Sequence, residues 1–183
     1  MSTLTKAESA RINGAKSRGP KTPQGRATSS MIVTYNGVSS TPLQLRVVDA
    51  SPAIFTLTQT GTGQGAILNQ NGTVNGSGNP EVAGNVIQIF GTGEGLTTPT
   101  HVTGTVYPVR LGLPTPVLPV GVTIGGVPVA PSDISYAGEA PGGVAGLIQV
   151  NAKIPAGVGS GPQQIFFTVG GAPSQAGVTV SVR

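Results

Sequence analysis

Few side chains in this sequence could do acid–base or metal chemistry. The chain has one histidine, His101, and no cysteine, which excludes disulfides, thiolate catalysis and any site that needs two histidines. His101 could act as a general base or bind a metal, because the ordinary pKa of imidazole is about 6.5. The nearest carboxylate in the sequence is Glu94, and a metal site would need further ligands from distant segments. We therefore interpret His101 as a solitary histidine of a surface loop.

Carboxylates are also sparse after the first thirty residues, where five occur, each alone in its segment. Two of them could meet in the folded chain, which would suit glycoside hydrolysis or calcium binding. Because isolated carboxylates form no pattern that points to such a pair, we predict no catalytic residue and no metal-binding residue. The five are Asp49, Glu81, Glu94, Asp133 and Glu139.

Two glycine-rich segments, 61–65 and 91–95, superficially resemble a dinucleotide-binding loop, in which glycine lets the backbone approach a pyrophosphate. Their spacing is G-x-G-x-G, and no helical pattern follows that would supply a helix N-terminus for the phosphate. The sequence also lacks a G-x-x-x-x-G-K-[ST] loop and a G-x-S-x-G elbow. We interpret both segments as turns between a strand and a loop, and we predict no cofactor.

Aromatic residues are few: three tyrosines, four phenylalanines and no tryptophan. Tyr35, Tyr107 and Tyr136 could form a platform on which a sugar stacks, because an aromatic ring offers an apolar face and tyrosine adds a polar tip. With so few aromatic side chains available, we interpret these tyrosines as residues of the core or of a sheet face. Carbohydrate binding is kept as an alternative.

The elements that position these side chains are predicted to be strands. Glycine and proline number 29 and 16, which argues against long helices because both residues break them. From Met31 onward apolar and polar residues alternate with a period of two, as in strands buried on one face, and turn dipeptides such as Asn71-Gly72 separate the runs. We predict an all-β chain that forms an antiparallel sandwich or barrel. The clearest alternating runs are 120–124, 148–154, 165–169 and 178–182.

Basic residues are concentrated in the first thirty positions, which hold six lysines or arginines and one glutamate. No aromatic residue accompanies them, and the composition is typical of a disordered tail. The cations could neutralise phosphates and give weak, sequence-independent nucleic-acid binding, but stacking aromatics and a recognition helix are missing. We interpret residues 1–30 as a solvated basic tail and keep nucleic-acid binding as the alternative function.

The sequence pattern predicts neither an export signal nor a membrane span. Residues 1–26 never place more than two apolar residues in a row, so the apolar core of a signal peptide is missing. Residues 111–132 are uncharged, but five prolines interrupt them, and a spanning helix must satisfy its backbone internally. The location of the protein is left open.

One weak internal repeat connects the two ends of the strand-rich region. Segments 33–48 and 167–182 both read as a strand, a turn, a serine-containing link and a second strand, with a slip of one residue before the second strands. Two hairpins of similar design suggest two related domains, of which the first is present only as its hairpin. The aligned pairs are Thr34 with Thr168, Gly37 with Gly171 and Ser40 with Ser174.

Three longer segments closely resemble one protein family. SPAIFTLTQTGTGQGAILNQNGTVN (51–75), GNVIQIFGTGEGLTTP (84–99) and residues 122–182 keep the order and approximate spacing of the uncharacterised C-terminal domain that recurs in Solibacter and other acidobacterial proteins. The strand 87–93 and the hairpin 167–174 are also similar to IPT/TIG modules. This resemblance covers the chain after the basic tail and implies an immunoglobulin-like sandwich. Members of the family usually lie at the C-terminal end of larger exported or cell-surface proteins.

Together these patterns predict three segments: a disordered basic tail over 1–30, a remnant hairpin of a preceding immunoglobulin-like domain over 31–50, and an immunoglobulin-like antiparallel β-sandwich over 51–183. We expect a non-enzymatic structural or adhesive module of a bacterial surface or secreted-type protein. Such a module acts as a spacer or binds a neighbouring domain, a protein or a glycan, for instance along an open sheet edge.

Overall fold

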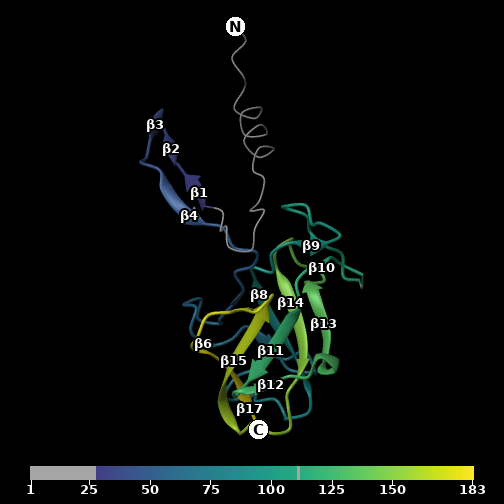
Figure 1. Cartoon of the computed structure of the whole chain (residues 1–183). Helices are drawn as coiled ribbons and strands as arrows, with labels where there is room; N and C mark the ends of the chain where they lie inside the picture. The colour runs from purple at the N-terminus through teal and green to yellow at the C-terminus, as the bar shows by residue number, and fades with distance from the viewer. Residues whose placement is uncertain (1–27, 111) are drawn as a thin grey trace. The chain divides into compact units, whose positions relative to one another are not determined.

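The computed structural model describes residues 28–110 and 112–183 (Figure 1). Among these residues there is no α-helix, and the one helical turn is the 3-10 turn η1 (Pro131–Asp133). The remaining regular structure is β-strand, which confirms the prediction of an all-β chain. In the described part no helix is long and apolar enough to cross a membrane. The predicted basic tail lies outside the described residues up to residue 27.

The chain divides into two compact units, one that ends at Val48 and one that spans Asp49–Arg183. In the described part of the first unit, two strands form an antiparallel hairpin and two shorter strands pair at its tip. Asn36 and Gly37 make the turn at the tip with φ angles of 48° and 80°, as an Asn-Gly hairpin turn requires. The strands are β1 (Thr28–Met31), β2 (Thr34–Tyr35), β3 (Val38–Ser39) and β4 (Leu43–Arg46).

The second unit contains two main sheets. In the first sheet the strand order is β12-β11-β15-β17-β6, and β16 pairs with β15. Strand β6 is parallel to its neighbour β17, whereas the other pairs are antiparallel. The strands are β6 (Gly63–Gln64), β11 (Val120–Ile124), β12 (Val127–Pro128), β15 (Gly161–Val169), β16 (Ala172–Pro173) and β17 (Val178–Val182).

The second sheet has the strand order β13-β14-β8-β5, and β7 also pairs with β8. All of its pairs are antiparallel. A separate ribbon of two short strands, β9 and β10, lies outside both sheets. The strands are β5 (Ala53–Ile54), β7 (Ile67–Leu68), β8 (Val86–Thr92), β9 (Thr97–Thr98), β10 (Thr115–Pro116), β13 (Ile134–Glu139) and β14 (Ile148–Lys153).

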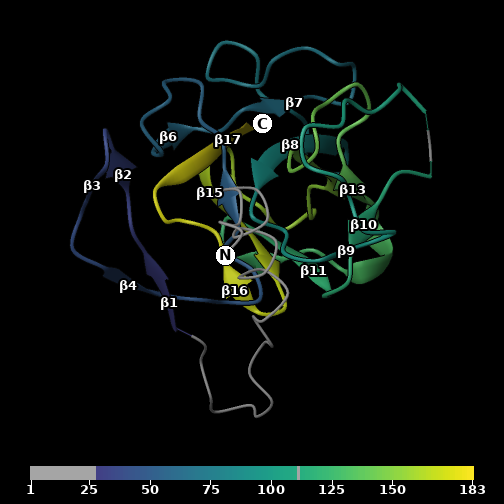
Figure 2. The same cartoon turned by 90° about the horizontal axis from the view of Figure 1, so that it is seen from above.

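The two sheets share one apolar core and form a sandwich; Figure 2 shows β15 and β17 in one layer and β8 and β13 in the other. As the alternating pattern predicts, Ile148, Val150 and Ala152 of β14 are fully buried. The layers approach closely where Gly91 of β8 faces the ring of Phe167 of β15. A Cβ at position 91 would lie 2.8 Å from a ring carbon, so this contact requires glycine.

Candidate functional site

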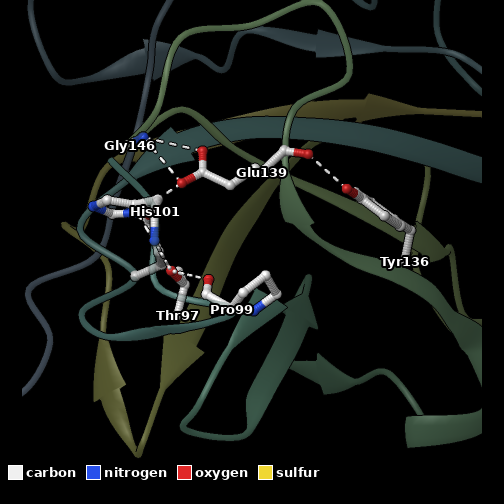
Figure 3. A network of polar contacts seen from close by, with 7 residues as sticks. Thr97, Pro99, His101, Tyr136, Glu139 and Gly146 are labelled. Atoms are coloured by element: carbon white, nitrogen blue, oxygen red, sulfur yellow. Dashed lines mark hydrogen bonds and ion pairs between the residues drawn. The ribbon is translucent and has the colours of Figure 1, made fainter. Parts of the chain in front are cut away.

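Three titratable side chains meet at one end of the sandwich: Glu94, His101 and Glu139. The Nδ1 atom of His101 lies 2.8 Å from Oε1 of Glu139 (Figure 3) and 3.8 Å from Oε1 of Glu94. One ligand atom from each residue lies within 4.8 Å of the other two. The side chains of Glu139 and Glu94 are 0% and 4% exposed, whereas that of His101 is 27% exposed. A buried pair of carboxylates therefore faces one imidazole that solvent can reach.

The sheet brings the two glutamates to the same end. Strands β8 and β13 are both antiparallel to β14, so they run in the same direction and end on the same side. Glu139, the last residue of β13, is paired with Ile148 of β14, and Ile148 is paired with Gly91 near the end of β8. Glu94 follows shortly after β8, which places it beside Glu139.

The backbone on either side of Glu94 has a geometry that only glycine allows. Gly93 and Gly95 have φ angles of +84° and +74°, and a Cβ at these positions would lie 1.9 Å from the carbonyl oxygen of Ser51 and 2.1 Å from that of Asp49. Any other residue would collide with the backbone at the start of the second unit. The glycines of segment 91–95 therefore pack a tight loop against the chain and fix the position of Glu94.

His101 is held by the β9 segment. Its backbone N–H donates to Oγ1 of Thr97 at 3.1 Å, and the same hydroxyl donates to the carbonyl oxygen of Pro99 at 3.1 Å. The Thr97 hydroxyl also lies 3.4 Å from Nδ1 of His101. Figure 3 shows these contacts on one side of the imidazole and the Glu139 carboxylate on the other. The ring therefore presents Nδ1 to the carboxylates.

Glu139 is supported from its own sheet and from the following loop. The backbone N–H of Gly146 donates to both carboxylate oxygens, at 3.2 and 3.0 Å, and the Tyr136 hydroxyl donates to the carbonyl oxygen of Glu139 at 2.5 Å. Burial raises the pKa of the Glu139 carboxyl above its ordinary value of 4.5. The negative charge of Glu94 raises this pKa further, against the opposing effect of Gly146 and His101.

Glu94 has no such support. Both of its carboxylate oxygens are buried, and within residues 28–110 and 112–183 neither has a hydrogen-bond partner. Nδ1 of His101 lies 3.8 Å from the Oε1 atom of Glu94. An unpartnered buried carboxylate is costly, because the group loses its hydration without receiving donors in exchange.

The structure corrects two interpretations made from the sequence. His101 is not solitary, because it contacts one glutamate and lies close to a second. Two of the five isolated carboxylates, Glu94 and Glu139, do meet, because Glu94 follows β8, Glu139 ends β13, and both strands pair with β14. Glu81 lies instead before the start of β8, at the other end of that strand.

The tyrosines do not gather in one described site. Tyr35 is 77% exposed in the first unit, whereas Tyr107 and Tyr136 are partly buried in the second. Burial, followed by the charge of Glu139, raises the pKa of Tyr136 above its ordinary value of 10.0. The role of Tyr136 in this cluster is thus to hold the backbone of Glu139, an interaction that no sequence motif indicated.

The chemistry available to the cluster follows from its groups. Two carboxylates and an imidazole can share protons or jointly bind a cation. Comparisons with family models, with curated proteins and with solved structures find no match. The resemblance to the acidobacterial domain family therefore stays a prediction.

Proposed function

We propose that the chain is a non-enzymatic structural module of a bacterial surface or secreted-type protein, an immunoglobulin-like sandwich that serves as a spacer between other domains. The order of its strands supports the immunoglobulin-like assignment. One sheet runs β5-β8-β14-β13 and the other contains β11-β15-β17. If these seven strands are lettered A to G along the chain and the shorter strands are left aside, their order corresponds to the ABED and CFG sheets of a constant-type immunoglobulin domain.

The hairpin of the first unit supports the proposal that several such modules follow one another, because it repeats the closing hairpin of the sandwich, formed by β15 and β17. In the first unit the N–H of Ser40 donates to the carbonyl of Val33 at 2.9 Å, and the N–H of Val33 donates to Oγ of Ser40 at 3.1 Å. In the sandwich, Ser174 and Phe167 make the same two hydrogen bonds at 2.9 and 3.2 Å. The pairing of β1 with β4 also matches the pairing of β15 with β17, once the slip of one residue in the repeat is included.

The two hairpins differ in how deeply their apolar side chains are buried. Phe167 and Val180 are fully buried in the sandwich, whereas Val33 and Leu45, at the matching positions, are 62% and 40% exposed. An apolar strand face of this kind is normally covered by a second sheet. The first hairpin is therefore suited to a second sandwich of the same design.

The observation that carries the spacer role is the parallel pairing of the short strand β6 with β17, the last strand of the sandwich. The N–H of Gly63 donates to the carbonyl of Gly177 at 2.7 Å, and the N–H of Gly65 to that of Thr179 at 2.9 Å. Because the two strands run in the same direction, pulling the ends of the domain apart loads these hydrogen bonds in shear. They must then break together, which suits a domain that transmits force.

Single-molecule pulling tests this role, and the absence of cysteine lets introduced cysteines define the attachment points. Thr62→Cys with Arg183→Cys loads the β6–β17 pair in shear, whereas Thr62→Cys with Ala176→Cys opens the same pair from one end. We expect the shear pair to unfold at a force several times higher than the matched control. Equal forces for the two attachment geometries would contradict the load-bearing role.

The alternative of nucleic-acid binding depends on the basic tail, most of which lies outside the described residues. No contact in the described part of the chain bears on it. Binding to a protein or a glycan remains a proposal for the same module, with the open sheet edges as its surface.

A further inference from the structure

We propose that Glu94, His101 and Glu139 bind a divalent transition-metal cation such as Zn²⁺. The distances are already close to those of a metal centre. Bonds from Zn²⁺ to imidazole nitrogen and carboxylate oxygen measure about 2.0–2.2 Å, so tetrahedral ligand atoms lie about 3.3–3.6 Å apart. Here Nδ1 of His101 lies 2.8 and 3.8 Å from the two carboxylates, and all three ligand atoms fall within 4.8 Å. Small side-chain movements would therefore accommodate the ion.

The unpartnered carboxylate of Glu94 is an independent reason to place a cation here. Its side chain is 4% exposed, and in the described residues its two oxygens receive no hydrogen bond. Glu139, also buried, adds a second carboxylate beside it. One imidazolium could neutralise only one of these charges, whereas a divalent cation could neutralise both and still bind neutral His101.

The donor types select the class of metal. Imidazole suits Zn²⁺, Fe²⁺, Ni²⁺ and Cu²⁺, whereas Ca²⁺ and Mg²⁺ prefer sites made of oxygen alone. The chain has no cysteine, so a site that depends on thiolates for softer ions is excluded. Among the common divalent ions available to such a mixed site, Zn²⁺ binds more tightly than Mn²⁺ or Fe²⁺ in the usual order of affinities. The fourth position would be open to water from the side of His101, the exposed member of the cluster.

The groups around the three residues hold them in place for this role. Gly146 donates to both oxygens of Glu139, and Thr97 accepts from the backbone N–H of His101. Gly93, with its positive φ angle, fixes the loop that carries Glu94. Such supporting contacts orient metal ligands, and their loss commonly costs about 10–100-fold in affinity.

The test is a titration of the tag-free, metal-free full chain with ZnCl₂, followed by calorimetry and by NMR of the imidazole. His101 is the one histidine in the sequence, so its ring signals report the site without ambiguity. We expect one equivalent of Zn²⁺ to bind, Nδ1 to become the liganded nitrogen, and CaCl₂ and MgCl₂ to have no effect. Unchanged imidazole signals at a large excess of Zn²⁺ would leave only a proton-sharing ion pair and would overturn the proposal.

Variants distinguish a loss of Zn²⁺ binding at this site from a loss of overall stability. Glu94→Gln keeps the shape of the side chain and removes its charge, and His101→Gln replaces a side chain that is 27% exposed. Each should weaken Zn²⁺ binding at least tenfold. Glu81→Gln is the matched control, because Glu81 is another buried glutamate, 6% exposed, at the opposite end of β8. It should keep the affinity of the wild type. Equal binding by Glu94→Gln and the wild type would refute the site, whatever its effect on folding, and the result is independent of the spacer role.

Discussion

A buried glutamate lies near each end of strand β8, and the two glutamates differ in their hydrogen-bond partners. Before the strand, Glu81 accepts hydrogen bonds from the N–H groups of Gln70 and Val82 at 2.6 and 2.8 Å and from Nδ2 of Asn85 at 2.9 Å. After the strand, Glu94 has no partner for either oxygen within the described residues. The two glutamates are similarly buried, 6% and 3% exposed. They differ in the number of hydrogen bonds that their carboxylates accept.

This difference distinguishes a structural charge from one that needs a ligand. A hydrogen bond to a charged group contributes about 1.5–3 kcal/mol, whereas the burial of an uncompensated charge costs several kcal/mol. The carboxylate of Glu81 is satisfied by the fold itself. The carboxylate of Glu94 receives no hydrogen bond within the described residues, and the proposed cation would supply the missing partner.

The largest expected effect comes from removing the satisfied charge. Glu81→Ala leaves three donors without their acceptor. Each hydrogen bond to a charged group contributes about 1.5–3 kcal/mol, of which water recovers part because Gln70 and Val82 are exposed. We expect a loss of about 3 kcal/mol in the free energy of unfolding, measured by urea denaturation with far-UV circular dichroism. A loss below about 0.5 kcal/mol, the range of ordinary surface substitutions, would show that the Glu81 contacts are not structural.

The prediction of the fold from the sequence succeeded where alternation was regular. The run from Ile148 to Ile154 predicted a strand with one buried face, and its inward residues are buried. Period-two alternation reports burial directly, because successive side chains point to opposite faces of a sheet. It does not report which strands become neighbours, and so the strand order was not predicted.

The cluster of titratable residues was missed for that reason. Glu94 and Glu139 are distant in the sequence, and they meet because β8 and β13 both pair with β14. No local pattern encodes this arrangement. The glycines on either side of Glu94 are the signal in the sequence that points to this loop. The structure shows that both have a tightly constrained backbone, but their spacing alone predicts only a turn.

Glu94→Gln, at the other end of β8, should change the free energy of unfolding in the opposite direction to Glu81→Ala. In the metal-free protein, Glu94→Gln removes a buried charge that receives no hydrogen bond within the described residues, while keeping the size of the side chain. We expect the free energy of unfolding to rise by about 1 kcal/mol, because a buried neutral amide without partners costs less than a buried charge. Urea denaturation of wild type and variant in the presence of a chelator measures this. A loss of stability instead would mean that Glu94 has a partner in solution and that the contrast with Glu81 is false.

The smallest expected effect is a change of stability with pH, which also tests the difference between Glu81 and Glu94. Burial alone would raise the pKa of Glu81, but the hydrogen bonds from Val82, Asn85 and Gln70 and the positive charge of Arg183 hold it below its ordinary value of 4.5. A carboxyl group with a lowered pKa in the folded state stabilises the protein above its unfolded pKa, and this contribution is lost as the pH falls through the folded pKa.

We therefore expect the wild type to lose stability below about pH 4.5, and Glu81→Gln, which cannot titrate at this position, to lose less over the same interval. Glu139 acts in the opposite sense and at higher pH, because its pKa is raised by burial, so protonation above pH 4.5 favours the folded state. The comparison of wild type with Glu81→Gln by urea denaturation at pH 5 and pH 3 isolates the Glu81 contribution. Parallel losses in the two proteins would mean that the hydrogen bonds to Glu81 do not favour its ionised form, and the distinction between the two ends of β8 would then rest on Glu94 alone.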